Sequence, residues 1–417
     1  MQTESISKPK TGRLDSLTTI RFLGAVYVAL GHWLYEIPVI SHKSTLWHFV
    51  LFARCSVSGF FLLSGFILAW VYLRDGKSIN KRQFYVSRFA RIYPLFLLTV
   101  VADIPIFFWS HIANYGVRGT LIKTGISFVS CLFMLQAWGR RFWGLNRPCW
   151  SLSAETFFYA LFPFLGVLLW RLRRQWTWPA MVLVYVSGQL LVLAAVKVVG
   201  RYPIDPEFLL FLPPLHVSTF FLGVLLAKLR VDADKKQRAS GRRGWTSYAL
   251  FLTVGISFVI LGLALPTSVT DSPTGQALLE DGVFSPFFCA LIWALCDSKT
   301  IISRLLTMKW PLLLGEASYG LYLIHDPVLH LVVPQLVHVF SNASWREFRI
   351  LYLLSFLVYL VVCIALSVAS YLWFEGPSRR WIRSRFGSRP REAGTLITPD
   401  DLALGNSDLR PFNSTSN

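Results

Sequence analysis

Long apolar runs separated by short polar segments dominate the sequence. A helix that spans a bilayer needs about 20 consecutive apolar residues, and ten runs reach roughly this length. One further run, 121–138, is shorter and is interrupted by glycine and serine. The pattern predicts an all-α, polytopic integral membrane protein of about ten transmembrane helices. The predicted spans are residues 17–38, 51–73, 91–110, 153–170, 179–199, 208–229, 247–266, 282–297, 312–338 and 350–374.

Lysine and arginine gather in six of the polar segments: the N-terminus, 74–91, 171–174, 228–243, 299–309 and 379–385. Cytoplasmic loops of membrane proteins carry such an excess, so these segments and both termini are predicted to be cytoplasmic. An even number of crossings is then required. The extra run 121–138 is therefore predicted to be a re-entrant or interfacial segment, where protein or a water-filled cavity covers its broken backbone.

Two charged segments fall on the opposite side in this topology. One is acidic and is predicted to be an outer loop, as the charge bias requires. The other is basic and runs against the bias, so it could line the entrance to a site for an anionic or sugar-bearing acceptor. The acidic residues are Asp271, Glu280 and Asp281, and the basic ones are Arg140, Arg141 and Arg147.

Composition supports a membrane domain and argues against nucleic-acid binding. Residues are 54% hydrophobic and only 15% charged, whereas a soluble domain has about 25% charged residues. The net charge of +19 comes from the loop clusters. The six cysteines lack metal-ligand or disulfide spacing and are predicted to be buried, and no metal site is predicted. Residues 14–377 form the predicted transmembrane domain, between a short cytoplasmic tail at 1–13 and a basic, then disordered, cytoplasmic tail at 378–417.

The first apolar run carries Arg21, His32 and Glu36. Ionisable side chains inside a spanning helix are costly unless they are paired or face a cavity, so each is a functional candidate. Eleven residues make about three turns, which places Arg21 and His32 on one face, roughly 16 Å apart along the axis. Glu36 lies one turn beyond His32, where it could orient the imidazole. The alternative is a snorkelling arginine and a histidine bonded to a neighbouring helix.

Further polar positions fall on the edges and faces of other predicted spans. Arg88 and Arg91 share a helical face and could grip phosphates through their guanidinium groups, or could simply anchor the helix at the cytoplasmic boundary. Ser58 and Ser64, each followed by glycine, indicate close helix packing or close approach of a ligand. Their spacing leaves both alternatives open.

Two more stretches combine serine, aromatic and ionisable residues. In Trp150-Ser151-Leu-Ser153-Ala-Glu155, the serines and the carboxylate could cap a helix or face a cavity. Ser318, Tyr322 and His325 fall on one helical face, where His325 suits a structural hydrogen bond or a catalytic role. Glu375-Gly376-Pro377 is expected to end the last predicted helix.

Taken in order, these stretches resemble the membrane-bound acyltransferase 3 family, in its stand-alone form without a fused esterase-like domain. The resemblance rests on Arg21-x10-His32, Phe-Phe-Leu-Leu-Ser-Gly-Phe-Ile-Leu, Arg-Phe-Ala-Arg-Ile-Tyr-Pro, Trp-Ser-Leu-Ser-Ala-Glu and Ser-Tyr-Gly-Leu-Tyr-Leu-Ile-His, between residues 13 and 377. Many family members carry a second polar residue beside the first-helix histidine, where this chain has Gly31.

The resemblance implies transfer of an acyl group, commonly acetyl, from acyl-coenzyme A to a hydroxyl of a glycan or a glycosylated natural product. His32 would then be the general base and Glu36 or Glu155 its carboxylate partner. Arg21, Arg88 and Arg91 would bind the coenzyme's phosphates, and Ser58, Ser64, Trp150, Ser151, Ser153, Ser318, Tyr322 and His325 would line the cavity. The acceptor could enter from the opposite side of the bilayer. The alternative function is a transporter or flippase for a lipid-linked or anionic solute, with Arg21 and His32 as a substrate and proton relay.

Overall fold

The computed structural model describes residues 14–37, 47, 52–76, 78–139, 144–199, 210–240, 245–264, 267–270, 272–296, 301–341 and 345–387. The predicted tails at 1–13 and 388–417, and Arg140, Arg141 and Asp271, lie outside these ranges. Within them the regular structure is helical throughout, which confirms the all-α prediction. The longer helices are α1 (Asp15–Glu36), α3 (Cys55–Tyr72), α4 (Lys81–Leu132), α7 (Arg174–Val199), α8 (Pro213–Ser240), α9 (Trp245–Ala264), α14 (Lys309–Ser341) and α15 (Trp345–Ser370).

Shorter helices connect or extend these. They are η1 (Phe52–Arg54), η3 (Arg147–Cys149), α5 (Trp150–Leu161), η4 (Phe162–Gly166), α6 (Val167–Trp170), α10 (Thr267–Thr270), α11 (Pro273–Glu280), α12 (Ser285–Leu295), α13 (Ile301–Leu306), η6 (Tyr371–Glu375) and α16 (Gly376–Phe386).

Eight helical segments of the described chain are long and apolar enough to cross a bilayer, which confirms a polytopic membrane protein. The other two predicted spans, 247–266 and 312–338, fall on the helices α9 and α14. The eight segments are Asp15–Glu36, Phe52–Tyr72, Lys81–Leu132, Arg147–Trp170, Arg174–Val199, Pro213–Lys235, Pro273–Leu295 and Ile350–Phe386.

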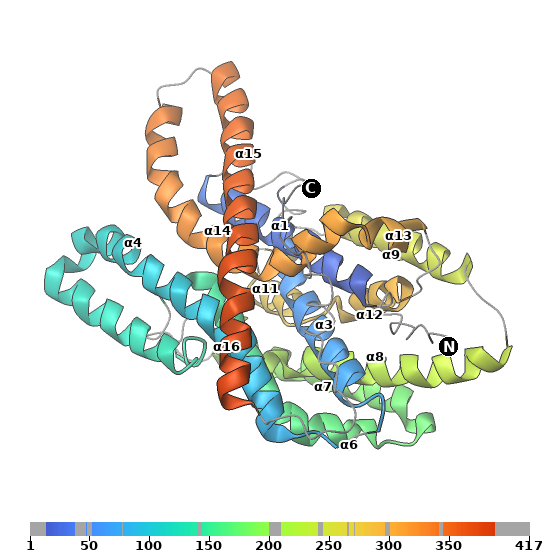
Figure 1. Ribbon diagram of the computed structural model, residues 1–417. Helices are drawn as coiled ribbons and strands as arrows, with labels where there is room; N and C mark the ends of the chain where they lie inside the picture. Colours follow the sequence, from blue (N-terminus) through green and yellow to red (C-terminus); the bar gives the residue numbers. More distant parts are fainter. Residues whose placement is uncertain are drawn as a thin grey trace, which may run out of the picture.

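The extra run 121–138 belongs to a helical hairpin. Helix α4 reverses at Gly116, whose φ of 65° lies in the left-handed region that glycine adopts without strain. The second limb of α4 runs to Leu132, and an irregular stretch follows it. Figure 1 shows this fold-back at the far left of the molecule. That the segment is re-entrant or interfacial stays a prediction.

Close helix contacts centre on small residues. Helix α3 packs along α8, and α1 packs along α14. A Cβ added at Gly65 of α3 would lie 2.0 Å from the Phe220 carbonyl oxygen, and one added at Gly223 of α8 would lie 2.0 Å from the Leu62 carbonyl oxygen. Backbone-to-backbone packing of this kind is what small residues permit in membrane helices. Packing therefore accounts for the glycine beside Ser64.

One sequence expectation about a helix end is wrong. The chain remains helical through Glu375-Gly376-Pro377, because the π-helical turn η6 joins α15 to α16 and Pro377 lies in the first turn of α16, where a missing N–H costs nothing. Glu280 and Asp281 of the predicted outer acidic segment lie at the C-terminal end of α11, and that this segment faces the outer side stays a prediction. Both are buried, because Glu280 pairs with Arg54 at 3.2 Å and Asp281 with His216 at 2.8 Å.

Candidate functional site

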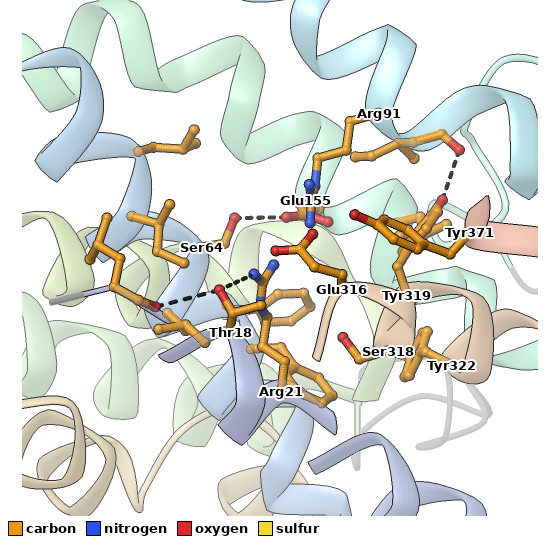
Figure 2. Close-up of a pocket in the computed structure, with 18 of the residues that line it drawn as sticks. Thr18, Arg21, Ser64, Arg91, Glu155, Glu316, Ser318, Tyr319, Tyr322 and Tyr371 are labelled. Atoms are coloured by element: carbon orange, nitrogen blue, oxygen red, sulfur yellow. Dashed lines mark hydrogen bonds between the residues drawn. The ribbon is translucent and has the colours of Figure 1, made fainter. Parts of the chain in front are cut away.

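A cavity of about 820 Å³ opens between α1, α3, α4, α5 and α14, and Arg21, Arg88 and Arg91 all line it. We call it the arginine cavity. Figure 2 shows Arg21 of α1 and Arg91 of α4 pointing toward one another, with Glu155 and Glu316 between them. Coulomb interactions connect Arg21 to both carboxylates and to Arg91. The three predicted phosphate-binding arginines thus come from two helices to one space.

Hydrogen bonds fix the polar side chains around this cavity. The Arg21 guanidinium donates to the Thr18 hydroxyl at 3.2 Å, one turn earlier on α1. Ser64 donates to Glu155 at 2.7 Å, and the Tyr159 hydroxyl donates to the same carboxylate oxygen. Glu155 therefore faces the cavity, and the capping alternative is wrong because α5 begins at Trp150 without a side-chain cap.

The inner end of the arginine cavity is polar and aromatic. Ser151, Ser318, Tyr322 and Phe60 line it there. The Ser151 and Tyr322 hydroxyls lie 2.8 Å apart, and the Phe60 ring packs edge-on against Tyr322 with ring centroids 6.0 Å apart. We call these four side chains the cavity wall. Behind it lies His325, whose ring centroid is 6.0 Å from that of Tyr322.

Four of the predicted lining residues lie elsewhere, so that expectation is wrong for them. Ser58 donates to the Glu280 carbonyl oxygen, and Ser153 donates to that of Met134, so both serve helix contacts. The Trp150 ring packs against His216, with ring centroids 5.0 Å apart. His325 is fully buried behind the cavity wall.

His32 meets His325 rather than a residue of its own helix. Nδ1 of His32 lies 3.1 Å from Nε2 of His325. Nδ1 of His325 lies 3.2 Å from the Leu321 carbonyl oxygen, which can only accept a hydrogen bond, so this nitrogen carries the proton. Nε2 of the neutral His325 then accepts from Nδ1–H of His32. The network therefore assigns His32 the tautomer in which Nε2 has a free lone pair.

The carboxylate beside His32 is Asp326, not Glu36 or Glu155 as the sequence suggested. Oδ1 of Asp326 lies 3.7 Å from Nδ1 of His32. Glu36 instead bonds Arg147 at 2.6 Å, because η3 brings this arginine to the end of α1. Glu155 is held in the arginine cavity by Ser64 and Tyr159, so neither glutamate orients the imidazole.

Sequence reasoning missed Asp326, Asp103 and Glu316, although each lies in or beside an apolar run. Asp103 is buried in α4 and accepts a hydrogen bond from the backbone N–H of Asn146 at 2.7 Å. Asn146 has a left-handed backbone and directly precedes Arg147. The rule that singled out His32, an ionisable side chain inside an apolar span, would have singled out these three as well.

Comparison with known proteins assigns the family. The chain matches the acyltransferase domain model of the acyltransferase 3 family over residues 14–372. It is 32% identical over 341 residues to acyltransferase MdmB of Streptomyces mycarofaciens, which covers 77% of this chain and 80% of that protein. It is 27% identical to the exopolysaccharide production protein ExoZ of Rhizobium meliloti, over 81% of this chain and 93% of that protein.

The match to a third relative is partial on the relative's side. O-acetyltransferase OatA of Staphylococcus aureus is 23% identical over 81% of this chain, and the match spans 54% of OatA. No solved structure matches the chain. The family model covers most of the chain and MdmB exceeds 30% identity over most of its length, so this protein belongs to the acyltransferase 3 family of membrane acyltransferases.

Proposed function

We propose that the protein transfers an acyl group, most simply acetyl, from acyl-coenzyme A to a hydroxyl of a glycan or of a glycosylated or secondary-metabolite acceptor. Family membership supplies the acyl transfer, and the names of OatA and ExoZ point to O-acetylation and polysaccharide production in those relatives. The observation that carries the proposal is the free Nε2 of His32, on the helix that also places Arg21 in the arginine cavity.

The donor would occupy the arginine cavity. Guanidinium groups bind phosphate oxygens in a bidentate manner, and Arg21, Arg88 and Arg91 supply three of them. Glu155 and Glu316 oppose this charge, so the phosphates would replace carboxylates as partners of the arginines. From Arg21 to His32 the helix rises about 16 Å, a span that an extended pantetheine arm bridges.

His32 would act as the general base. Its Nε2 takes the proton of the acceptor hydroxyl while that oxygen attacks the thioester carbonyl carbon. The C–O bond forms, the C–S bond breaks, and the imidazolium returns the proton to the departing thiolate. His325 holds His32 in the required tautomer, and the Asp326 carboxylate stabilises the imidazolium, as the aspartate of a catalytic triad does.

Access to His32 depends on the wall at the inner end of the cavity. Neither histidine lines the arginine cavity, whereas Phe60 and Tyr322 do. The Phe60 ring also packs on α1 at Gly24, between Arg21 and His32. In this proposal one of the two rings turns aside to let the thioester reach His32.

The test uses purified, detergent-solubilised protein and radiolabelled acetyl-coenzyme A. His32→Ala should abolish hydrolysis and transfer, and Arg88→Ala/Arg91→Ala should raise KM. His111→Ala is the matched control, because His111 lies on α4 and bonds only its neighbour Ser110 and the Phe107 carbonyl oxygen among the described residues. Unchanged turnover in a folded His32→Ala protein would refute the role of His32. A wild-type protein that neither binds nor turns over acetyl-coenzyme A would refute the donor.

A further inference from the structure

We infer that the acceptor reaches His32 through a second opening, separate from the arginine cavity, and that this opening selects uncharged or cationic hydroxyl compounds over anionic ones. The inference rests on the proposed acyl transfer, because it names the acceptor of that reaction. It is carried by the Arg147 cluster, which we define as Glu36, Arg147, Asp326 and His330.

Solvent reaches His32 from a direction other than the arginine cavity. The His32 side chain is 38% exposed, yet it is absent from the cavity lining. Its neighbours in the Arg147 cluster are exposed to a similar degree: Arg147 37%, His330 31% and Glu36 25%. None of them lines the arginine cavity either. Ionisable groups in membrane helices face a protein interior or a water-filled space rather than lipid, so these four side chains surround an aqueous opening.

The Arg147 guanidinium already has partners within the cluster. The Arg147 guanidinium lies 2.6 Å from Glu36, 2.9 Å from Nε2 of His330 and 3.8 Å from Asp326. Two carboxylates therefore face one guanidinium, and with neutral imidazoles the cluster has no net positive charge. An anionic acceptor would find Arg147 paired and would meet the Glu36 carboxylate. Of the two acceptors expected at Arg147, anionic or sugar-bearing, this geometry favours the sugar-bearing one.

The buried carboxylate of the cluster calls for a hydrogen-bond donor. Asp326 is fully buried, and its oxygens have only long contacts with side-chain donors of the described residues. Nδ1 of His32 lies at 3.7 Å, Nδ1 of His330 at 3.5 Å and the Arg147 guanidinium at 3.8 Å. A buried acceptor without a close donor is costly. A hydroxyl or an ammonium group can donate to it, whereas a carboxylate or phosphate ligand cannot. Hydroxyl-rich neutral sugars and amino sugars fit this requirement.

A reporter cysteine tests the opening without needing the acceptor. His330→Cys places a thiol in the cluster and leaves Glu36, Arg147 and Asp326 in place. Its reaction rates with a cationic and an anionic methanethiosulfonate reagent are compared with those of free cysteine. We expect the ratio of the cationic to the anionic reaction rate to be about three- to tenfold higher at residue 330 than for free cysteine. Adding Glu36→Gln should lower this ratio, and adding Arg147→Gln should raise it.

Three controls make the outcome decisive. The wild-type protein reports labelling of its own cysteines, of which five are buried and Cys289 is half-buried. Saturating coenzyme A should leave the labelling of His330→Cys unchanged. It should protect Ile67→Cys, a position that lines the arginine cavity. If His330→Cys does not purify as a monodisperse protein, Tyr35→Cys is the second reporter, at an exposed site coupled electrostatically to Arg147.

Each failure has its own meaning. No labelling at the reporter by either reagent, or a preference for the anionic one, would overturn the inference. Protection of His330→Cys by coenzyme A would overturn it too, because both positions would then share one cavity. Failure of coenzyme A to protect Ile67→Cys would instead count against the proposed donor site and leave the charge preference at residue 330 standing.

Discussion

Nδ1 of His32 lies 3.1 Å from Nε2 of His325, although 293 positions separate the two residues in the chain. The contact exists because α1 packs along α14. The contact gives His32 a defined tautomer, because the Leu321 carbonyl oxygen fixes the tautomer of His325. The Tyr359 hydroxyl donates to the His325 carbonyl oxygen at 3.0 Å and ties α15 to the same point. Catalysis by His32 would thus depend on three helices.

Asp326→Asn should lower kcat by about 10²–10⁴-fold, the range that one general base contributes, because the imidazolium loses its stabilising charge. KM for acetyl-coenzyme A should not change, since Asp326 does not line the arginine cavity. Steady-state kinetics with radiolabelled acetyl-coenzyme A measures both constants. A change confined to KM would show that Asp326 acts in binding and not on the proton.

Arg21→Gln should raise KM for acetyl-coenzyme A by about tenfold or more, because a hydrogen bond to a charged group contributes about 1.5–3 kcal/mol. Arg21→Lys keeps the charge but loses the bidentate guanidinium fork, so its KM should fall between those of the wild type and Arg21→Gln. Raising the salt concentration should weaken binding in the wild type more than in Arg21→Gln. Equal KM values for Arg21→Gln and the wild type would remove Arg21 from the donor site.

Asp103 and its partner Asn146 offer a test of positioning. Asp103→Ala leaves the buried N–H of Asn146 without an acceptor, which costs about 1–3 kcal/mol and frees the turn that carries Arg147. Asp103→Asn keeps an acceptor oxygen at the same place. We expect Asp103→Ala to lower kcat at least tenfold and Asp103→Asn to stay within threefold of the wild type. Equal losses in both variants would indicate that the charge of Asp103, and not the hydrogen bond, matters.

Local pattern was enough to predict the helices, but not that Arg21 lines the arginine cavity while His32 does not. Apolar runs of spanning length predicted the α-helical class, and helical periodicity placed Arg21 and His32 on one face. These features depend on residues that are near in sequence. The family resemblance extended the prediction to acyl transfer, which the family match supports.

Partners that come from distant helices could not be predicted from spacing. Glu36 at i+4 from His32 was the nearest carboxylate in sequence, but its side chain reaches Arg147, and Asp326 of α14 takes its place. The helix stop expected at Glu375-Gly376-Pro377 failed for a related reason. A π-helical turn and the ion pair between Glu375 and Arg379 carry the chain through it, and this tertiary context does not appear in the local sequence.

The buried pair of His216 and Asp281 yields a prediction about stability. Both side chains are fully buried, and their closest atoms are 2.8 Å apart. Removing one partner of a buried pair leaves an uncompensated polar group and typically costs about 3–5 kcal/mol. Asp281→Ala should therefore lower the free energy of unfolding by this amount, measured by denaturation in detergent. Asp75→Ala is the control, because the pair of Asp75 with Arg74 is exposed and contributes about 0–1 kcal/mol.

The double variant His216→Leu/Asp281→Leu separates pairing from packing. If the loss in Asp281→Ala comes from the stranded histidine, replacing both polar groups with apolar ones should restore much of the stability, so the double variant should be more stable than the sum of the single losses implies. The Gln189 and Thr219 side chains bond the Asp281 backbone carbonyl and keep their partner in every variant. Strictly additive losses would mean that the two side chains stabilise α8 and α11 independently.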